Sequence, residues 1–358
     1  MKVIIHPGMH KTGTSSIQAF LKANCTGDFS FAPLLSENQS ALLVLLFQDL
    51  DLLKDYHGFR TRGEAFTTDL PRLRKVRQAQ LDVFMDTAAD KTVIFSAEVL
   101  SQPNMRTVTQ RLKEYLQRWT SDISVLAYVR APKDYYRSAF QQHLKGDVKL
   151  VAKPGAFWPN YRRRFQKFDE IFGHDNVTIR HYSPDALLNG DVVQDFASAI
   201  GMKHSGEPIK RTNETLSAEA TALLFLQRTL GEGFGEYHRS AQANDLAFIN
   251  DLRSIGTSNF TFSDEYWQPI QDRNREDLAW IENRIGTPLV GARVANAIVM
   301  RNEADLIELA LRSYPLLEAL LLERISGLKQ PLQEKTLCAL SLLKTIHAQT
   351  SAHGDKTE

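Results

Sequence analysis

A loop near the N-terminus carries glycines, a lysine and hydroxyl side chains in an order suited to binding an anion. Its sequence is Gly8-Met9-His10-Lys11-Thr12-Gly13-Thr14-Ser15-Ser16. The β-branched run Val3–His6 precedes it, and a helical pattern starts at Ser15. A loop of this kind turns its backbone N–H groups inward, and the positive end of the following helix adds to the attraction. The segment therefore predicts a phosphate or sulfate site.

The position of the lysine indicates which anion the loop binds. The Walker A pattern of nucleoside triphosphatases places lysine directly after the second glycine, where Thr14 stands here. Lys11 precedes that glycine by two positions, and this arrangement resembles the 5′-phosphosulfate loop of sulfotransferases that use 3′-phosphoadenosine-5′-phosphosulfate (PAPS). The resemblance implies that Lys11 contacts the oxygen bridging sulfate and phosphate, and that Thr14 and Ser15 bind the 5′-phosphate. An ordinary glycine turn before a helix is the alternative.

A second segment resembles the same family at its 3′-phosphate site. Arg130 ends the strand predicted at Ile123–Val129, and Ser138 follows eight residues later on a predicted helix. The resemblance implies that these two side chains bind the 3′-phosphate that distinguishes PAPS from ATP. Taken alone, the pair is equally typical of a salt bridge and a surface hydroxyl.

Further along the chain, Lys210 and Arg211 begin a polar segment that runs to Ser217. This segment resembles the basic loop that closes over the nucleotide in the same family. A basic loop before a helix capped by Ser217 explains the residues equally well.

Sulfuryl transfer also needs a group that removes the proton of the acceptor. Glu98 is the first choice as base, because it stands just beyond the predicted strand Thr92–Phe95, and the carboxyl ends of parallel strands border the ligand crevice. Related sulfotransferases carry their catalytic His or Glu in this region. The histidines at 6, 10 and 143 are weaker candidates. A structural ion pair is the alternative role for Glu98.

The elements around these residues indicate the fold. Strand-like runs, the last of them Val177–Tyr182, alternate with helical patterns such as Tyr161–Phe172 up to about residue 200. This alternation predicts a parallel sheet covered by helices on both faces. We expect a P-loop-type three-layer α/β/α core over residues 1–215 and a helical extension over residues 216–358. The helices expected in the extension are Ala218–Leu230, Asp264–Arg284, Ala304–Leu328 and Leu332–His347.

Composition restricts the kinds of partner. The 358 residues have a net charge of +1, which argues against nucleic-acid binding through a general basic field. Cys25 and Cys338 are the two cysteines, so neither a disulfide framework nor a cysteine metal site is expected. No signal peptide or membrane span is recognisable, and a cytoplasmic location is expected. The C-terminal helices are expected to cover the acceptor site or to form a homo-oligomer.

The combined prediction is an enzyme that moves a sulfuryl group from PAPS to a hydroxyl or amine of an acceptor such as a carbohydrate, and releases adenosine 3′,5′-bisphosphate without a metal. The runner-up is a small-molecule kinase of the P-loop type. A nucleotide-binding protein without catalytic activity is the third reading, in which the helical extension carries the function.

Overall fold

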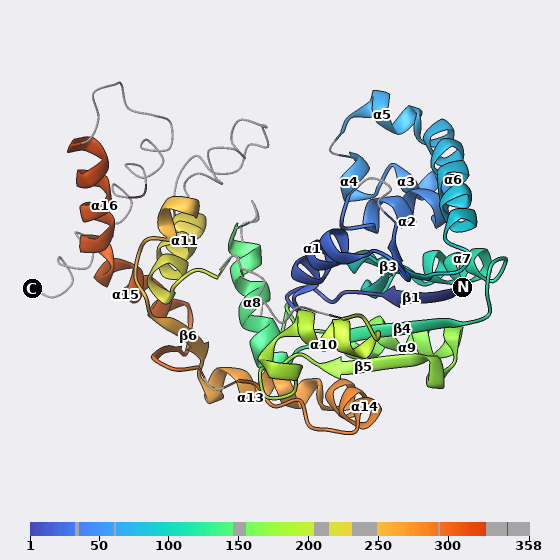
Figure 1. The fold of residues 1–358 in the computed structure, drawn as a ribbon. Helices are drawn as coiled ribbons and strands as arrows, with labels where there is room; N and C mark the ends of the chain where they lie inside the picture. The colour runs from blue at the N-terminus through green and yellow to red at the C-terminus, as the bar shows by residue number, and fades with distance from the viewer. Residues whose placement is uncertain are drawn as a thin grey trace, which may run out of the picture. The chain divides into compact units, whose positions relative to one another are not determined.

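The computed structural model describes most of the chain (Figure 1). The described residues are 1–32, 36–60, 62–145, 155–203, 215–230, 249–292, 294–326 and 342. The predictions for Lys210, Arg211 and the helix Leu332–His347 fall outside them, apart from residue 342.

Five parallel strands form the central sheet, in the order β2-β3-β1-β4-β5. They are β1 (Lys2–His6), β2 (Phe29–Phe31), β3 (Thr92–Ser96), β4 (Ile123–Val129) and β5 (Val177–His181). Four of them coincide closely with the predicted strands. The edge strand β2 was not predicted, because three residues give too short a pattern to recognise. The α/β class with a parallel sheet is confirmed.

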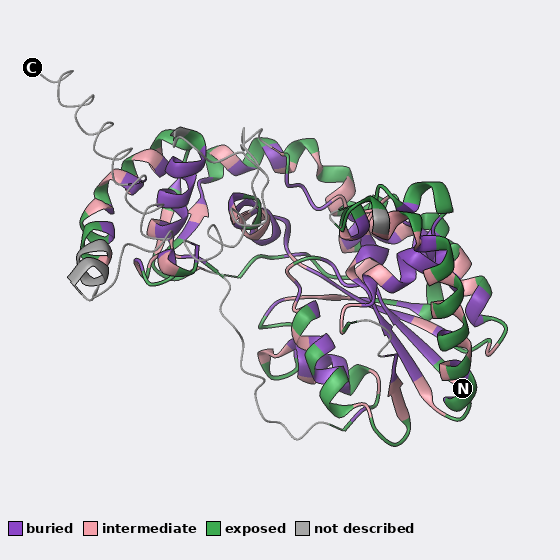
Figure 2. Ribbon diagram, turned by 90° about the horizontal axis from the view of Figure 1, so that it is seen from above, coloured by how far each residue is buried: buried purple, intermediate pink, exposed green. Residues whose placement is uncertain are grey.

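Helices cover both faces of this sheet. On one face, α1 (Thr14–Asn24) and α10 (Val192–Ala199) pack over alternate strand residues, and Ile4, Ile94 and Tyr128 share a buried core with Phe196. On the other face, α7 (Arg106–Leu116) contacts α9 (Tyr161–Phe172) and α2 (Ser40–Phe47). Figure 2 shows the strands as mostly buried between these layers. Burial on both faces explains the nearly continuous apolar runs of the strands.

The remaining elements beside the sheet are short, apart from one long helix. They are α3 (Leu50–Leu53), α4 (His57–Arg60), α5 (Glu64–Thr68), α6 (Leu70–Thr87) and the 3-10 turns η1 (Glu98–Ser101), η2 (His174–Asn176) and η3 (Leu188–Gly190). The helix α14 (Arg275–Ile285) also packs here, because Arg284 forms an ion pair with Asp169 of α9 at 2.8 Å.

The strand order has a switch point between β1 and β4. From β1 the chain continues to β2 and β3 on one side, whereas β4 and β5 lie on the other side. Ligands of open α/β sheets bind outside the carboxyl ends of strands at such a switch point. The segments after β1 and β4 therefore flank the expected ligand position.

The later part of the chain is not wholly helical, so that part of the prediction was wrong. Alongside α11 (Ala218–Leu230), α13 (Asp264–Arg273), α15 (Glu303–Arg312) and α16 (Tyr314–Ser326), it contains β6 (Asn259–Phe262) and β7 (Ala297–Met300). These two strands pair in parallel. The helix α8 (Pro132–Lys145) comes earlier in the chain. The side chains of Phe260 and Phe262 are buried and contact the ring of Phe140 on α8, which gives the strand β6 an apolar face.

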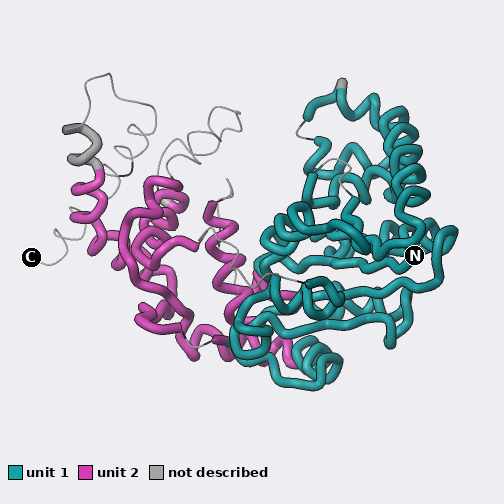
Figure 3. Tube along the Cα trace, viewed as in Figure 1, with its two compact units in different colours: residues 1–131, 160–211, 276–291 teal, residues 132–159, 212–275, 292–358 magenta. Residues whose placement is uncertain are grey.

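The chain divides into two compact units (Figure 3). Unit 1 comprises residues 1–131, 160–211 and 276–291, and it contains the sheet described above. Unit 2 comprises residues 132–159, 212–275 and 292–358. The chain passes between the units several times, and the boundary expected near residue 215 lies close to one of these passages. Among the described residues, no helix has the length and apolar character needed to cross a membrane.

Candidate functional site

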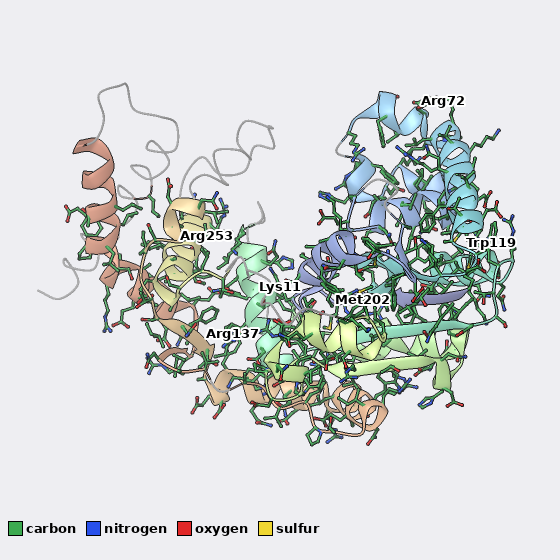
Figure 4. All side chains as sticks on the ribbon, viewed as in Figure 1. Lys11, Arg72, Trp119, Arg137, Met202 and Arg253 are labelled. Atoms are coloured by element: carbon green, nitrogen blue, oxygen red, sulfur yellow. The ribbon has the colours of Figure 1, made fainter. Side chains whose placement is uncertain are left out.

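Three segments of unit 1 meet at the carboxyl edge of the sheet: the loop after β1, the 3-10 turn η1 after β3, and Arg130 after β4. Lys11 lies at this edge, at the end of the sheet remote from the N-terminus (Figure 4). The pairing of β1 with β3 continues past the strands, because the Ala97 N–H donates to the His6 carbonyl at 3.1 Å. The structure thus brings His10, Lys11 and Glu98 to one place.

The backbone of the loop is shaped for an anion. Lys11 and Gly13 both adopt left-handed conformations, with φ of 66° and 77°. Gly13 is the N-cap of α1, and no side chain caps that helix and no acidic residue lies in its first turn. The first N–H groups of a helix have no acceptor within the helix. An oxyanion placed before α1 would supply acceptors and would interact favourably with the helix dipole.

Both glycines of the loop are required sterically. A Cβ on Gly8 would lie 2.3 Å from Thr14 Oγ1, and one on Gly13 would lie 2.6 Å from Val192 Cγ1. Because Gly8 has no Cβ, the loop packs closely against Thr14 at the start of α1. Because Gly13 has none, the loop packs closely against Val192 of α10.

The hydroxyl side chains of the loop divide into two groups. Thr12 is fully buried, and its Oγ1 donates to the Met9 carbonyl at 2.7 Å. Thr14 is also buried, and its Oγ1 donates to the same carbonyl at 3.4 Å. Ser15 is exposed. In this conformation the two threonines hold the shape of the loop, whereas the Ser15 hydroxyl is accessible to a ligand.

Arg130 lies against the same loop. Its Nη1 donates to the Lys11 carbonyl at 3.3 Å, and its guanidinium lies 5.8 Å from the ring centroid of Tyr182. Tyr161 further fixes this position, because its hydroxyl donates to the Arg130 carbonyl. A guanidinium has five N–H donors, so the contact with Lys11 leaves donors for a phosphate. Sequence reasoning missed Tyr182, which follows β5 and lies beside both Arg130 and Gly13.

The other predicted residues are placed differently. Ser138 and His143 lie on α8 in unit 2, and their positions relative to Arg130 are not determined. Their roles remain sequence predictions, as do those of Lys210 and Arg211.

Glu98 and His10 form a close pair beside this loop. The distance from His10 Nδ1 to Glu98 Oε2 is 3.1 Å. Ser101 joins the two segments, because its Oγ contacts the Gly8 carbonyl at 2.8 Å and the Glu98 carbonyl at 2.9 Å. The site therefore brings together the Lys11 side chain, a loop backbone shaped to suit an anion, and the His10–Glu98 pair.

His6 lies beneath the loop and not in the site. Its side chain is fully buried between the rings of Tyr128 and Phe196, and its Nδ1 lies 2.8 Å from Ser96 Oγ. Its Nε2 has no hydrogen-bond partner in the described part of the chain. Burial lowers the pKa of His6 to about 3. A neutral, inaccessible imidazole cannot take a proton from a substrate, so His6 is a core residue.

The buried imidazole predicts a pH dependence of stability. In the unfolded chain the pKa of His6 is about 6.5, so between that value and about 3 the unfolded state binds the extra proton. The free energy of unfolding should therefore fall as the pH drops through this window. His6→Phe should make the fall less steep, whereas His174→Gln, at an exposed histidine, should not. Urea titrations at several pH values measure both slopes, and an unchanged slope in His6→Phe would refute the assignment.

The fit of Gly13 against Val192 predicts a specific loss of stability. Gly13→Ala should cost about 1–2 kcal/mol for the left-handed backbone and about 1–3 kcal/mol more for the clash. Gly27 is a matched control, because its φ is 60° and a Cβ there meets no atom within 4 Å. Gly27→Ala should show the first cost alone. In a Val192→Ala background, Gly13→Ala should cost less, and equal costs in both backgrounds would rule out the clash.

Comparisons with known proteins give no match for this chain. No family model matches the chain, and no curated protein matches it. The geometry at the carboxyl edge of the sheet and the motifs in the sequence are therefore the basis for assigning a function.

Proposed function

We propose that this protein is a sulfotransferase that moves a sulfuryl group from PAPS to a hydroxyl or amine of an acceptor, such as a carbohydrate. The observation that carries the proposal is the uncapped start of α1, preceded by Lys11 and flanked by Arg130. Sulfate and phosphate groups both suit such a loop. In this proposal the parallel sheet belongs to the P-loop type, with helices in three layers.

The first part of the mechanism concerns the co-substrate. The loop N–H groups and the exposed Ser15 hydroxyl hold the 5′-phosphate, and Arg130 binds the 3′-phosphate. Lys11 places its ammonium on the bridging oxygen, where negative charge develops as the sulfur–oxygen bond breaks. The role of Ser138 in the 3′-phosphate site stays a sequence prediction.

The second part concerns the acceptor. Its oxygen or nitrogen attacks sulfur in line with the departing phosphate oxygen, and its proton passes to the His10–Glu98 pair. This pair lies on the same edge of the sheet as Lys11, as the transfer requires. The products are the sulfated acceptor and adenosine 3′,5′-bisphosphate.

A kinase of the P-loop type differs from a sulfotransferase in the position of the loop lysine. A Walker lysine reaches the β- and γ-phosphates from directly after the second glycine, where this chain has the buried Thr14. No feature of the described site favours a kinase over a sulfotransferase.

Lys11→Met should lower kcat of sulfuryl transfer by about 10²-fold or more, because it removes a charge that acts on the transition state. The affinity for adenosine 3′,5′-bisphosphate should change much less. Lys22→Met is the control, because Lys22 lies in the last turn of α1 with its side chain 66% exposed. Transfer of labelled sulfate from PAPS to a panel of sugars, phenols and amines supplies the assay. A near-normal kcat in Lys11→Met would exclude Lys11 from the mechanism.

The nucleotide preference tests the function without knowledge of the acceptor. A charge-assisted contact contributes about 1.5–3 kcal/mol, so adenosine 3′,5′-bisphosphate should bind at least about tenfold more tightly than ADP. Arg130→Ala should remove most of this preference, whereas Arg118→Ala, at an exposed arginine, should retain it.

Calorimetric titration of these two nucleotides and of ATP, with and without a magnesium chelator, measures the preference. Equal affinity in the wild type, or tighter magnesium-dependent binding of ATP, would reject the sulfotransferase and favour the kinase.

A further inference from the structure

The contact between His10 and Glu98 favours one tautomer of the imidazole. The carboxylate oxygen Oε2 lies 3.1 Å from Nδ1 of the imidazole. At this distance an N–H on Nδ1 is attracted by the carboxylate, whereas a lone pair on Nδ1 would be repelled by it, so the tautomer with its proton on Nδ1 is favoured. In the neutral imidazole the other nitrogen, Nε2, then carries the lone pair and is the basic atom.

The two side chains differ in their access to solvent. The His10 side chain is 48% exposed and that of Glu98 is 21% exposed. The more accessible member of the pair is therefore the imidazole. A substrate entering the site meets His10 more readily than the carboxylate.

The backbone that carries Glu98 is held in place from several sides. The Ser101 hydroxyl spans the Glu98 and Gly8 carbonyls, and the Val99 N–H donates to Ser40 Oγ at 3.1 Å. The buried Lys167 of α9 donates through its ammonium to the Gln102 carbonyl, directly after η1. Such support from outside fixes the orientation of a catalytic side chain.

We infer that His10 is the proton acceptor of the reaction and that Glu98 is the residue that positions it. This inference rests on the proposed sulfotransferase function and reverses the order expected from the sequence, where Glu98 came first. The arrangement follows the general logic of a nitrogen base whose second nitrogen is oriented by a carboxylate.

With a hydroxyl acceptor, the transfer forms one bond to sulfur and breaks one. The acceptor oxygen forms a bond to sulfur while the bond between sulfur and the bridging oxygen breaks. The electron pair of the broken bond stays on the 5′-phosphate of adenosine 3′,5′-bisphosphate, next to Lys11. The proton of the hydroxyl moves to His10 Nε2, and the Glu98 carboxylate stabilises the imidazolium until the proton returns to solvent.

The alternative is a structural role, in which Glu98 and a protonated His10 form a surface ion pair. Exposed pairs of this kind contribute about 0–1 kcal/mol to stability and need have no catalytic role. The two accounts differ in the protonation of Nε2, which can be measured directly.

The first test measures the imidazole of His10 by nitrogen NMR in the protein without nucleotide, at mildly alkaline pH. We expect the neutral form with its proton on Nδ1, and a shift toward the Nε2-protonated form in Glu98→Gln. The imidazole resonances that are absent from the spectrum of His10→Gln assign the His10 signals. A doubly protonated ring, or a tautomer that does not respond to Glu98→Gln, would overturn the inference.

The second test measures turnover with water as the acceptor, through the release of labelled sulfate from PAPS. His10→Gln should lower kcat by about 10²- to 10⁴-fold, and Glu98→Gln by about 10- to 100-fold, the usual effect of losing a supporting carboxylate. Glu98→Asp should recover part of the loss. His174→Gln should behave as the wild type.

The outcomes separate the two proposals. A Glu98→Gln variant that is inactive beside a His10→Gln variant of normal kcat would overturn the role of His10. A wild type that transfers sulfate neither to water nor to any acceptor, despite the expected tautomer, would instead reject the sulfotransferase function.

Discussion

The pairing of β1 with both β3 and β4 is the constraint on which the rest of the site depends. The three strands run parallel, so their carboxyl ends reach the same edge of the sheet. The loop Gly8–Ser16, the turn that carries Glu98, and Arg130 follow these three strands in turn. The register of the sheet thus places a lysine, an acid–base pair and a guanidinium together, although they come from distant parts of the sequence.

Steric fit then fixes the loop within this frame. The chain turns back on itself because Gly8 allows close contact with Thr14. It packs against α10 because Gly13 has no side chain that would clash with Val192. The buried hydroxyl of Thr12 holds the turn between them. The conformation leaves the N–H groups at the start of α1 available, which is the property that suits the loop to an oxyanion.

Much of the frame could be predicted from the sequence, because it depends on local patterns. The strand Ile123–Val129 and the helix Tyr161–Phe172 have the predicted bounds, since the strand is a nearly continuous apolar run and the helix has a clear apolar periodicity. The strands β6 and β7 were missed, because four residues each are too few to outweigh the helical patterns around them. The expected single helix Asp264–Arg284 is two helices, which separate at Asn274.

The candidate site was predictable in its residues but not in its contacts. Lys11, Arg130 and Glu98 stand at strand ends that sequence patterns reveal. The contact of His10 with Glu98 and the place of Tyr182 beside Arg130 depend on strand order and loop conformation, which no local pattern specifies. The burial of the Thr14 hydroxyl likewise follows from packing on Gly8 and not from the motif.

The most direct measurement of the central claim is a crystal structure of the protein with adenosine 3′,5′-bisphosphate. The account predicts that the 5′-phosphate lies within hydrogen-bond distance of the N–H groups between Lys11 and Ser15, and that the 3′-phosphate lies on Arg130. The nucleotide bound elsewhere, or bound in this loop with its 3′-phosphate remote from Arg130, would contradict it.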